Sequence, residues 1–238
     1  MPYFVERGLM KKHNPFSTLT AFEWALWLTS ALLVIISFIL APDDILTLIA
    51  SLIGVTALIF VAKGHILGQL LSVVFAVFYG IISFFFHYFG EMLTYLCMTA
   101  PIALIAVFSW LKHPYKDSAE VEVSRPTGKQ LTLMFVLCIL VTVVFYFVLG
   151  ALGTANLLIS TFSVTTSFLA CYLTYLRSPY YALAYAANDV VLIVLWLLAA
   201  FTDISYLPMI VCFTAFLAND LYGFINWRRM QKKQEEDK

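Results

Sequence analysis

Eight stretches of roughly 20 predominantly apolar residues follow one another along this chain of 238 residues. A bilayer core is about 30 Å thick, so a helix that rises about 1.5 Å per residue needs about 20 apolar residues to cross it. The runs are continuous rather than alternating, which favours transmembrane helices over the strands of a membrane β-barrel. The predicted spans are residues 21–40, 45–62, 66–86, 91–111, 130–150, 157–176, 180–200 and 206–227.

The composition excludes the main soluble classes. Charged residues make up 12% of the chain, about half the share that is typical of a soluble domain, and hydrophobic residues make up 62%. Lys+Arg and Asp+Glu balance at 14 each, which argues against a nucleic-acid-binding protein that works by bulk positive charge. The polar residues are too few to cover a soluble core of this size. We therefore predict an all-α polytopic membrane protein embedded in a lipid bilayer.

Short segments with Gly, Pro, Asn or Asp separate the spans, as these residues commonly end helices. The boundary between the third and fourth spans is the weakest, because residues 83–89 are almost all aromatic. Residues 1–20 contain no apolar run long enough for a cleavable signal peptide, so we expect them to form an N-terminal segment on the inner side.

The positive charges predict the orientation of the spans. If the N-terminus lies inside and the chain crosses eight times, all 14 Lys and Arg residues fall in inside segments. Asp43, Asp44 and Asp203 then lie outside, with Glu91 at the outer edge. The positive-inside rule therefore predicts that both termini are cytoplasmic.

Spans two to four resemble spans six to eight. Residues 51–56 (SLIGVT) match residues 160–165 (STFSVT), and Trp110-Leu-Lys matches Trp227-Arg-Arg near the end of each unit. Tyr79 aligns with Trp196 between these two anchors. Three helices invert the chain, so a parallel repeat needs one extra crossing between the units, and span five supplies it.

This pattern predicts a three-plus-one-plus-three core with one additional N-terminal helix. Two parallel repeats are a known transporter plan, with the substrate bound between them near the midplane. The predicted parts are the N-terminal segment 1–20, the additional helix 21–40, the first bundle 45–111, the cytoplasmic loop 112–129, the linker helix 130–150, the second bundle 157–227 and the cytoplasmic tail 228–238.

Polar side chains inside spans are candidates for a binding site, because they are expensive in hydrocarbon. In the last span Asn219, Tyr222 and Asn226 are spaced i, i+3 and i+7, so they share one helix face that offers amides and a phenol. Such a face suits a neutral ligand with hydroxyl and carboxamide groups better than an anion. Hydrogen bonding between helices is the alternative role of these side chains.

Further candidates lie in the third and seventh spans, and one more lies in the last. Asn188 lies in the seventh span, where we expect it to contact a ligand, and Gln69 lies near the inner end of the third. Asp189 and Asp220 could form a gate pair, a packing network or a proton site, and the sequence leaves these alternatives open. Tyr79 and Trp196, like Tyr222, could stack on a flat ring.

The remaining motifs are uninformative about chemistry. The hydroxyls of the sixth span, among them Ser160, are expected to bond to carbonyls of their own helix. Trp110 and Trp227, at span ends, are expected to be membrane-interface anchors. No sequence motif of a hydrolase, a nucleotide-binding loop or a metal site is present, so we predict no catalytic residue, no metal and no cofactor, and a protein that is not an enzyme.

The last two spans resemble those of the PnuC family of bacterial vitamin transporters. The resemblance rests on the pattern Phe-x-x-Asn-x-x-Tyr-x-x-x-Asn-Trp at residues 216–227, after a span with Asn188 in its middle, and extends over roughly residues 45–230. It implies a fold related to that of the SWEET sugar transporters. It also implies that Asn188, Asn219, Tyr222, Asn226 and Gln69 bind substrate. Residues 99–110 lack the Asn and aromatic-rich stretch of many members, which suggests a site built mainly from the second repeat.

The resemblance further implies a function and partners. Members import nicotinamide riboside, and relatives take thiamine or riboflavin. They are thought to work by facilitated diffusion in the bacterial inner membrane, with a cytoplasmic kinase that phosphorylates the vitamin and so traps it. Crystallised members suggest a homotrimer.

Three hypotheses follow. The first is a uniporter for nicotinamide riboside that works by alternating access, with Pro101 as a candidate flexing point in the fourth span. The second is transport of another vitamin such as thiamine, or transport coupled to protons through Asp189 or Asp220. The third is a membrane-embedded enzyme or scaffold that moves no substrate.

Overall fold

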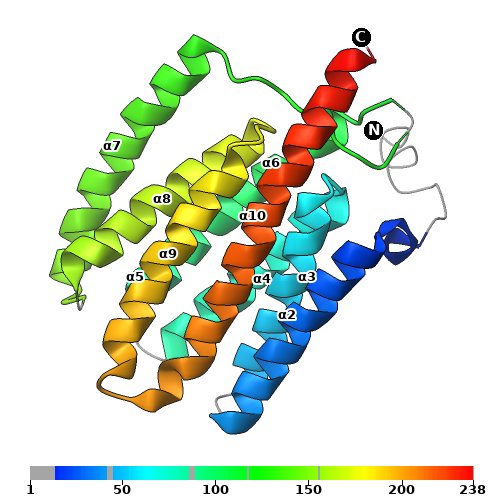
Figure 1. Cartoon of the computed structure of the whole chain (residues 1–238). Helices are drawn as coiled ribbons and strands as arrows, with labels where there is room; N and C mark the ends of the chain where they lie inside the picture. Colours follow the sequence, from blue (N-terminus) through cyan, green and yellow to red (C-terminus); the bar gives the residue numbers. More distant parts are fainter. Residues whose placement is uncertain (1–13, 42–44, 86–88, 117, 155, 238) are drawn as a thin grey trace.

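The structure is a computed structural model that describes residues 14–41, 45–85, 89–116, 118–154 and 156–237. Within these residues, eight helices are long and apolar enough to cross a membrane, which confirms the predicted all-α fold (Figure 1). The elements are η1 (Pro15–Thr18), α2 (Ala21–Leu40), α3 (Ile45–Ala62), α4 (Ile66–Phe85), α5 (Phe89–Leu93), η2 (Thr94–Thr99), α6 (Ala100–Lys112), α7 (Gly128–Ala151), α8 (Leu157–Tyr175), α9 (Tyr181–Ala200), η3 (Ile204–Tyr206) and α10 (Leu207–Glu236).

The helices are antiparallel along the chain, so the described Lys and Arg residues gather at one end of the bundle, which we call the basic end. In Figure 1 it lies at the top, where α7 begins and α10 ends. Most of the predicted N-terminal segment, the break at residues 42–44 and the centre of the uncertain third boundary, residues 86–88, lie outside the described residues.

The last helix is longer than the predicted span 206–227, because α10 continues to Glu236, into the predicted tail. The additional turns are held by the connection between α6 and α7. The Gln234 amide accepts a bond from the Val123 N–H at 2.8 Å and donates to the Val121 carbonyl at 3.1 Å, and Arg125 pairs with Glu235. Hydrogen bonds from Tyr115 and Lys116 lower the pKa of Asp237, which follows the helix.

The helices form two bundles that meet in a symmetric way. The first contains α3, α4 and the run α5–η2–α6, and the second contains α8, α9 and α10. Between the bundles, the first helix of each packs against the last helix of the other, as α3 on α10 and α8 on α6. A two-fold axis between parallel repeats predicts this pairing. The linker α7 packs mainly on α8, and the additional helix α2 packs on α3 and α10, at the opposite edge of the molecule (Figure 1).

The two aligned tryptophans make equivalent hydrogen bonds. Trp110 Nε1, in the last helix of the first bundle, donates to the Thr174 carbonyl at 3.1 Å near the end of α8. Trp227 Nε1, in α10, donates to the Val61 carbonyl at 2.8 Å near the end of α3. The two rings lie against each other, with centroids 5.4 Å apart. The expectation that they anchor the protein at the membrane interface is therefore wrong, because both are buried between the bundles.

A wide helical turn precedes Pro101. Residues 94–99 form a π-helical turn, in which the Ala100 N–H bonds to the Tyr95 carbonyl five residues earlier. Proline has no N–H, and its ring would meet the carbonyl four residues before it in a regular α-helix. A π turn relieves such a clash, and these turns often occur at functional sites. The helical ladder is thus interrupted next to the predicted flexing point, although the motion itself remains a prediction.

Replacing either buried tryptophan should lower stability through its hydrogen bond. We expect Trp227→Phe and Trp110→Phe each to lower the free energy of unfolding by about 1–3 kcal/mol, because a buried carbonyl loses its donor. The measurement is thermal unfolding of the detergent-purified protein. Trp24→Phe is the matched control, because no hydrogen bond of its indole is recorded among the described residues. Equal effects at all three positions would contradict this account.

Candidate functional site

A small cavity lies between the two bundles, near the middle of the helices. Its volume is about 70 Å³, which is room for about two water molecules at ~30 Å³ each. Pockets for vitamin-sized ligands usually start near about 300 Å³, so a ligand can enter this inner cavity only if the helices move apart. Its main polar and aromatic lining residues are Gln69, Ser72, Phe75, Tyr95, Thr99, Ser167, Tyr185, Asn188, Asp189, Phe213, Phe216 and Asp220.

Asn188 of α9 lies in the wall of the inner cavity with a fixed orientation. Its Oδ1 accepts hydrogen bonds from Thr166 Oγ1 at 2.8 Å and Ser167 Oγ at 3.0 Å, both on α8. Two hydroxyl donors fix the carbonyl side of the amide. The NH₂ group therefore points away from these hydroxyls and keeps its donor hydrogens for another partner. Other α8 hydroxyls bond to their own helix as predicted, since Thr161 and Thr165 donate to carbonyls four residues earlier.

The two aspartates of the inner cavity face each other. Asp189 of α9 and Asp220 of α10 are both buried, and their carboxyl groups are within hydrogen-bonding reach. Two adjacent carboxylates repel strongly in a low-dielectric interior, so this contact is a hydrogen bond only when one of them carries a proton. Gln69, which is also buried, lines the same cavity from the first bundle. Four predicted site residues are thus brought together.

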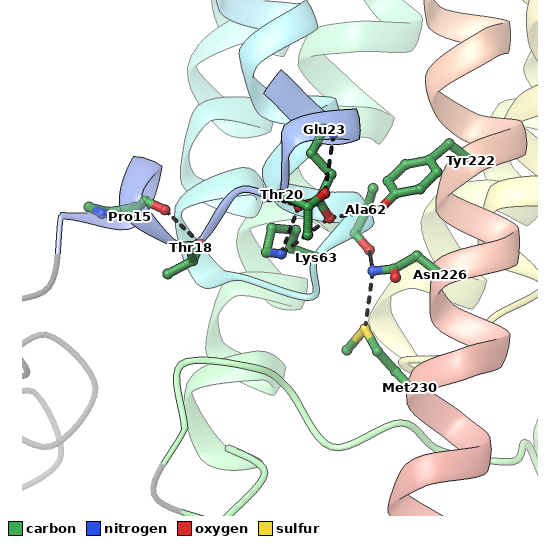
Figure 2. A network of polar contacts seen from close by, with 9 residues as sticks. All are labelled: Pro15, Thr18, Thr20, Glu23, Ala62, Lys63, Tyr222, Asn226 and Met230. Carbon is green, nitrogen blue, oxygen red and sulfur yellow. Dashed lines mark hydrogen bonds and ion pairs between the residues drawn. The ribbon is translucent and has the colours of Figure 1, made fainter. Parts of the chain in front are cut away.

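The polar face of α10 lies elsewhere. Asn219 Nδ2 donates to Ser30 Oγ of α2 at 2.9 Å and to the Ala215 carbonyl. Tyr222 donates to Glu23 Oε1 of α2 at 2.7 Å, and Asn226 Nδ2 donates to the Ala62 carbonyl at the end of α3 at 2.9 Å (Figure 2). These three side chains share a face as predicted, but that face contacts helices and not the cavity.

Glu23 is the centre of this buried network and is 1% exposed. Lys63 Nζ lies 3.1 and 3.0 Å from its two carboxylate oxygens, and the Thr20 N–H donates to Oε2 at 2.6 Å (Figure 2). The same threonine caps the start of α2 in a capping box. One carboxylate therefore connects the additional helix to the first bundle through Lys63 and to the second through Tyr222.

A larger cavity of about 290 Å³ lies toward the end opposite the basic end. Trp196 of α9, Glu91 of α5 and Ser160 of α8 are among its lining residues, so Trp196 lies in a different cavity from Asn188. Tyr79 lines neither cavity; its ring lies 4.5 Å from that of Tyr95, and its side chain is a hydrogen-bonding neighbour of Glu91.

Glu23, Glu91 and Tyr95 were absent from the predicted site residues. The signal for Glu23 was present, since it is a charge within a predicted span, three residues after a capping threonine. Tyr95 reaches the inner cavity from the π turn, which the sequence did not predict. Among the described residues, no three His, Cys, Asp or Glu side chains lie close enough to hold a metal ion.

The family described as "Nicotinamide mononucleotide transporter" matches residues 44–229, most of the chain. The chain belongs to this family. It is 28% identical over 228 residues to "Nicotinamide riboside transporter PnuC" of Neisseria mucosa, covering 93% of this chain and 86% of the relative. It is 26% identical over 199 residues to the protein of that name from Haemophilus influenzae, covering 83% and 85%.

A solved structure supports the same assignment. "Crystal structure of the Vitamin B3 transporter PnuC" superposes with a TM-score of 0.78 and 26% identity, covering 98% of this chain and 99% of the other. The resemblance to the PnuC family is confirmed, and the relatives are transporters and not enzymes. The chain is therefore a multi-pass membrane protein of a transporter family.

The Glu23 network predicts coupled effects on stability. Tyr222→Phe should lower the free energy of unfolding by about 1.5–3 kcal/mol, because it removes a hydrogen bond to a charged group. In the Glu23→Gln background, Tyr222→Phe should lower the free energy of unfolding by clearly less, since the stability effects of residues in contact are not additive. Thermal unfolding of the four proteins gives the coupling, with Tyr146→Phe on the exposed face of α7 as control. Additive effects of Tyr222 and Glu23 would show that they act independently.

Proposed function

We propose that this protein carries nicotinamide riboside across the bacterial inner membrane by facilitated diffusion. The observation that supports the proposal is the inner cavity, which lies between two symmetric bundles and is lined by amides, hydroxyls and aromatic rings. These groups suit a ribose, a carboxamide and a flat ring. Two relatives carry nicotinamide riboside in their names.

The charges of the cavities favour the riboside over the mononucleotide that appears in the family description. None of the described residues lining either cavity is Lys, Arg or His. Three carboxyl groups, of Glu91, Asp189 and Asp220, are present instead. A phosphate would be repelled here and would find no cationic partner. A riboside carries a positive pyridinium ring and no phosphate, so its charge is complementary to this lining.

The proposed mechanism is alternating access. The inner cavity is too small for a nucleoside, so the bundles must separate to admit one. Among the described elements, the bundles meet mainly along the helix pairs α3–α10 and α6–α8. The π turn before Pro101 contributes Tyr95 and Thr99 to the cavity wall, so bending there would change the wall directly. In this proposal both termini are cytoplasmic, the protein is a homotrimer, and a cytoplasmic kinase phosphorylates the imported riboside.

The site residues divide into two groups in this proposal. Asn188 and Gln69 contact the substrate, because both line the inner cavity. Asn219, Tyr222 and Asn226 position α10 against α2 and α3. Proton coupling is a second candidate mechanism, which the facing carboxyl groups of Asp189 and Asp220 favour.

Removing the oriented amide of the inner cavity should weaken binding. We expect Asn188→Ala to weaken the binding of nicotinamide riboside at least about fivefold, since a lost hydrogen bond to a buried group costs about 1–3 kcal/mol. Asn219→Ala, which loses its bond to Ser30, should mainly lower stability. Titration calorimetry on the purified oligomer measures the binding affinity, and scanning calorimetry measures the stability. Thr214→Ala, on an exposed part of α10, is the control. If Asn219→Ala alone lowered the affinity for nicotinamide riboside fivefold, the polar face of α10 would be the binding face after all.

Uptake into proteoliposomes tests the function and its driving force. Vesicles that hold only this protein should equilibrate nicotinamide riboside and should not accumulate it when a proton or sodium gradient is imposed. Accumulation that an uncoupler abolishes would instead support the proton-coupled mechanism, and Asp189→Asn should then remove it. Vesicles that take up no riboside at all would refute the proposed function.

A further inference from the structure

The larger cavity holds a carboxylate, that of Glu91, which has no cationic partner among the described residues. Glu91 Oε2 is buried and has no hydrogen-bond partner among the described residues. No salt bridge of Glu91 is recorded there either, and the sequence contains no Lys or Arg between Lys63 and Lys112. Glu91 as a whole is half-buried in the cavity wall, and a carboxylate without a counter-charge within a membrane span is costly and marks a functional site by default.

The surroundings of Glu91 suit a flat organic cation. Trp196, a buried tryptophan, is in the wall of the same cavity, and the face of an indole ring attracts cations. Ser160 and Ser163 of α8 and Thr94 of η2 add hydroxyl groups. The volume of about 290 Å³ is near the lower end of the range for small-molecule pockets, which is about 300–1,000 Å³.

The two cavities lie at successive depths along the same helices. On α5–η2, Glu91 lines the larger cavity and Tyr95 the inner one; on α9, Trp196 lines the larger cavity and Asp189 the inner one. Separations of four to seven residues correspond to about 6–10 Å along a helix. Tyr79 connects the two levels, since it neighbours Glu91 and packs on Tyr95. A ligand in the larger cavity therefore lies about two helical turns or less from the inner cavity.

We propose that the larger cavity is a second binding site, an entry site in which Glu91 and Trp196 select a positively charged, N-substituted pyridinium ring before it reaches the inner cavity. The proposal rests on the proposed function for the identity of this ring. The carboxylate supplies the counter-charge, the indole supplies a stacking face, and the hydroxyl groups face the polar substituents. The site thereby favours a ring with a charge over a neutral ring of the same shape.

The test compares nicotinamide riboside with its neutral 1,4-dihydro form, which has nearly the same shape and no ring charge. In proteoliposomes, Glu91→Gln should raise the KM for the cation at least about fivefold and leave the KM for the dihydro form within about twofold. Trp196→Leu should also raise the KM for the cation more than the KM for the dihydro form. Asp203→Asn is the matched control, because it removes a negative charge near the same end outside either cavity, and it should change neither constant.

A direct binding measurement separates this proposal from the proposed function. 1-Methylnicotinamide, a pyridinium without the ribose, should quench the tryptophan fluorescence of purified protein, and at least about fivefold more of it should be needed for Glu91→Gln. If the wild-type protein takes up no riboside but binds this probe through Glu91, the function fails and the cation site stands. The cation site is overturned if Glu91→Gln binds the probe like the wild type, if the wild type does not bind it, or if Glu91→Gln affects charged and neutral ribosides equally.

Discussion

A charge that is removed from water needs a partner, and the arrangement of this molecule depends on how that requirement is met at Glu23. The carboxylate is buried by protein at the start of α2, and Lys63, Tyr222 and the Thr20 N–H together satisfy it. Removing one member of a buried ion pair costs about 3–5 kcal/mol, because the other charge is left buried and unpaired. The additional helix therefore has one favourable position, against both bundles at once, and its contacts use the polar face of α10.

The same requirement bears on the two cavities, which are lined by carboxyl groups. At the basic end, carboxylates have cationic partners within the chain, as Glu23 has Lys63 and Glu235 has Arg125. In the two cavities, Glu91, Asp189 and Asp220 have no described cationic neighbour in the lining. An anionic solute would add to this negative charge, whereas a cationic solute or a proton reduces it. Under the proposed function, this distribution of charge favours a cationic substrate over an anionic one before any specific contact is considered.

The sequence was sufficient for the spans and the repeat, because both depend on hydrophobic length and charge asymmetry, which are local properties. Asn188 and Gln69 were picked out from the sequence because an amide is conspicuous in an apolar helix, and both line the inner cavity, although their contact with substrate stays a prediction. The direction of the α10 face could not be predicted, because i, i+3, i+7 spacing gives a common face but not the neighbour that it meets. That neighbour is α2, which lies about 190 residues earlier in the chain and is held by Glu23. The π turn and the tryptophan contacts between bundles likewise depend on packing that the pattern does not encode.

The described hydrogen bonds between the two bundles are concentrated at the basic end. Trp110 and Ser109 donate from α6 to α8, and Trp227 and Asn226 donate from α10 to the end of α3. Toward the opposite end, where the larger cavity lies, the described contacts between the bundles are apolar instead, such as those of Val55 and Tyr79 with Trp196 and Phe213. Each such hydrogen bond contributes only about 0.5–1.5 kcal/mol net, so all four together amount to a few kcal/mol. In the proposed alternating-access mechanism, the contacts of a bound substrate have to offset these hydrogen bonds and the apolar packing between the bundles before the basic end opens.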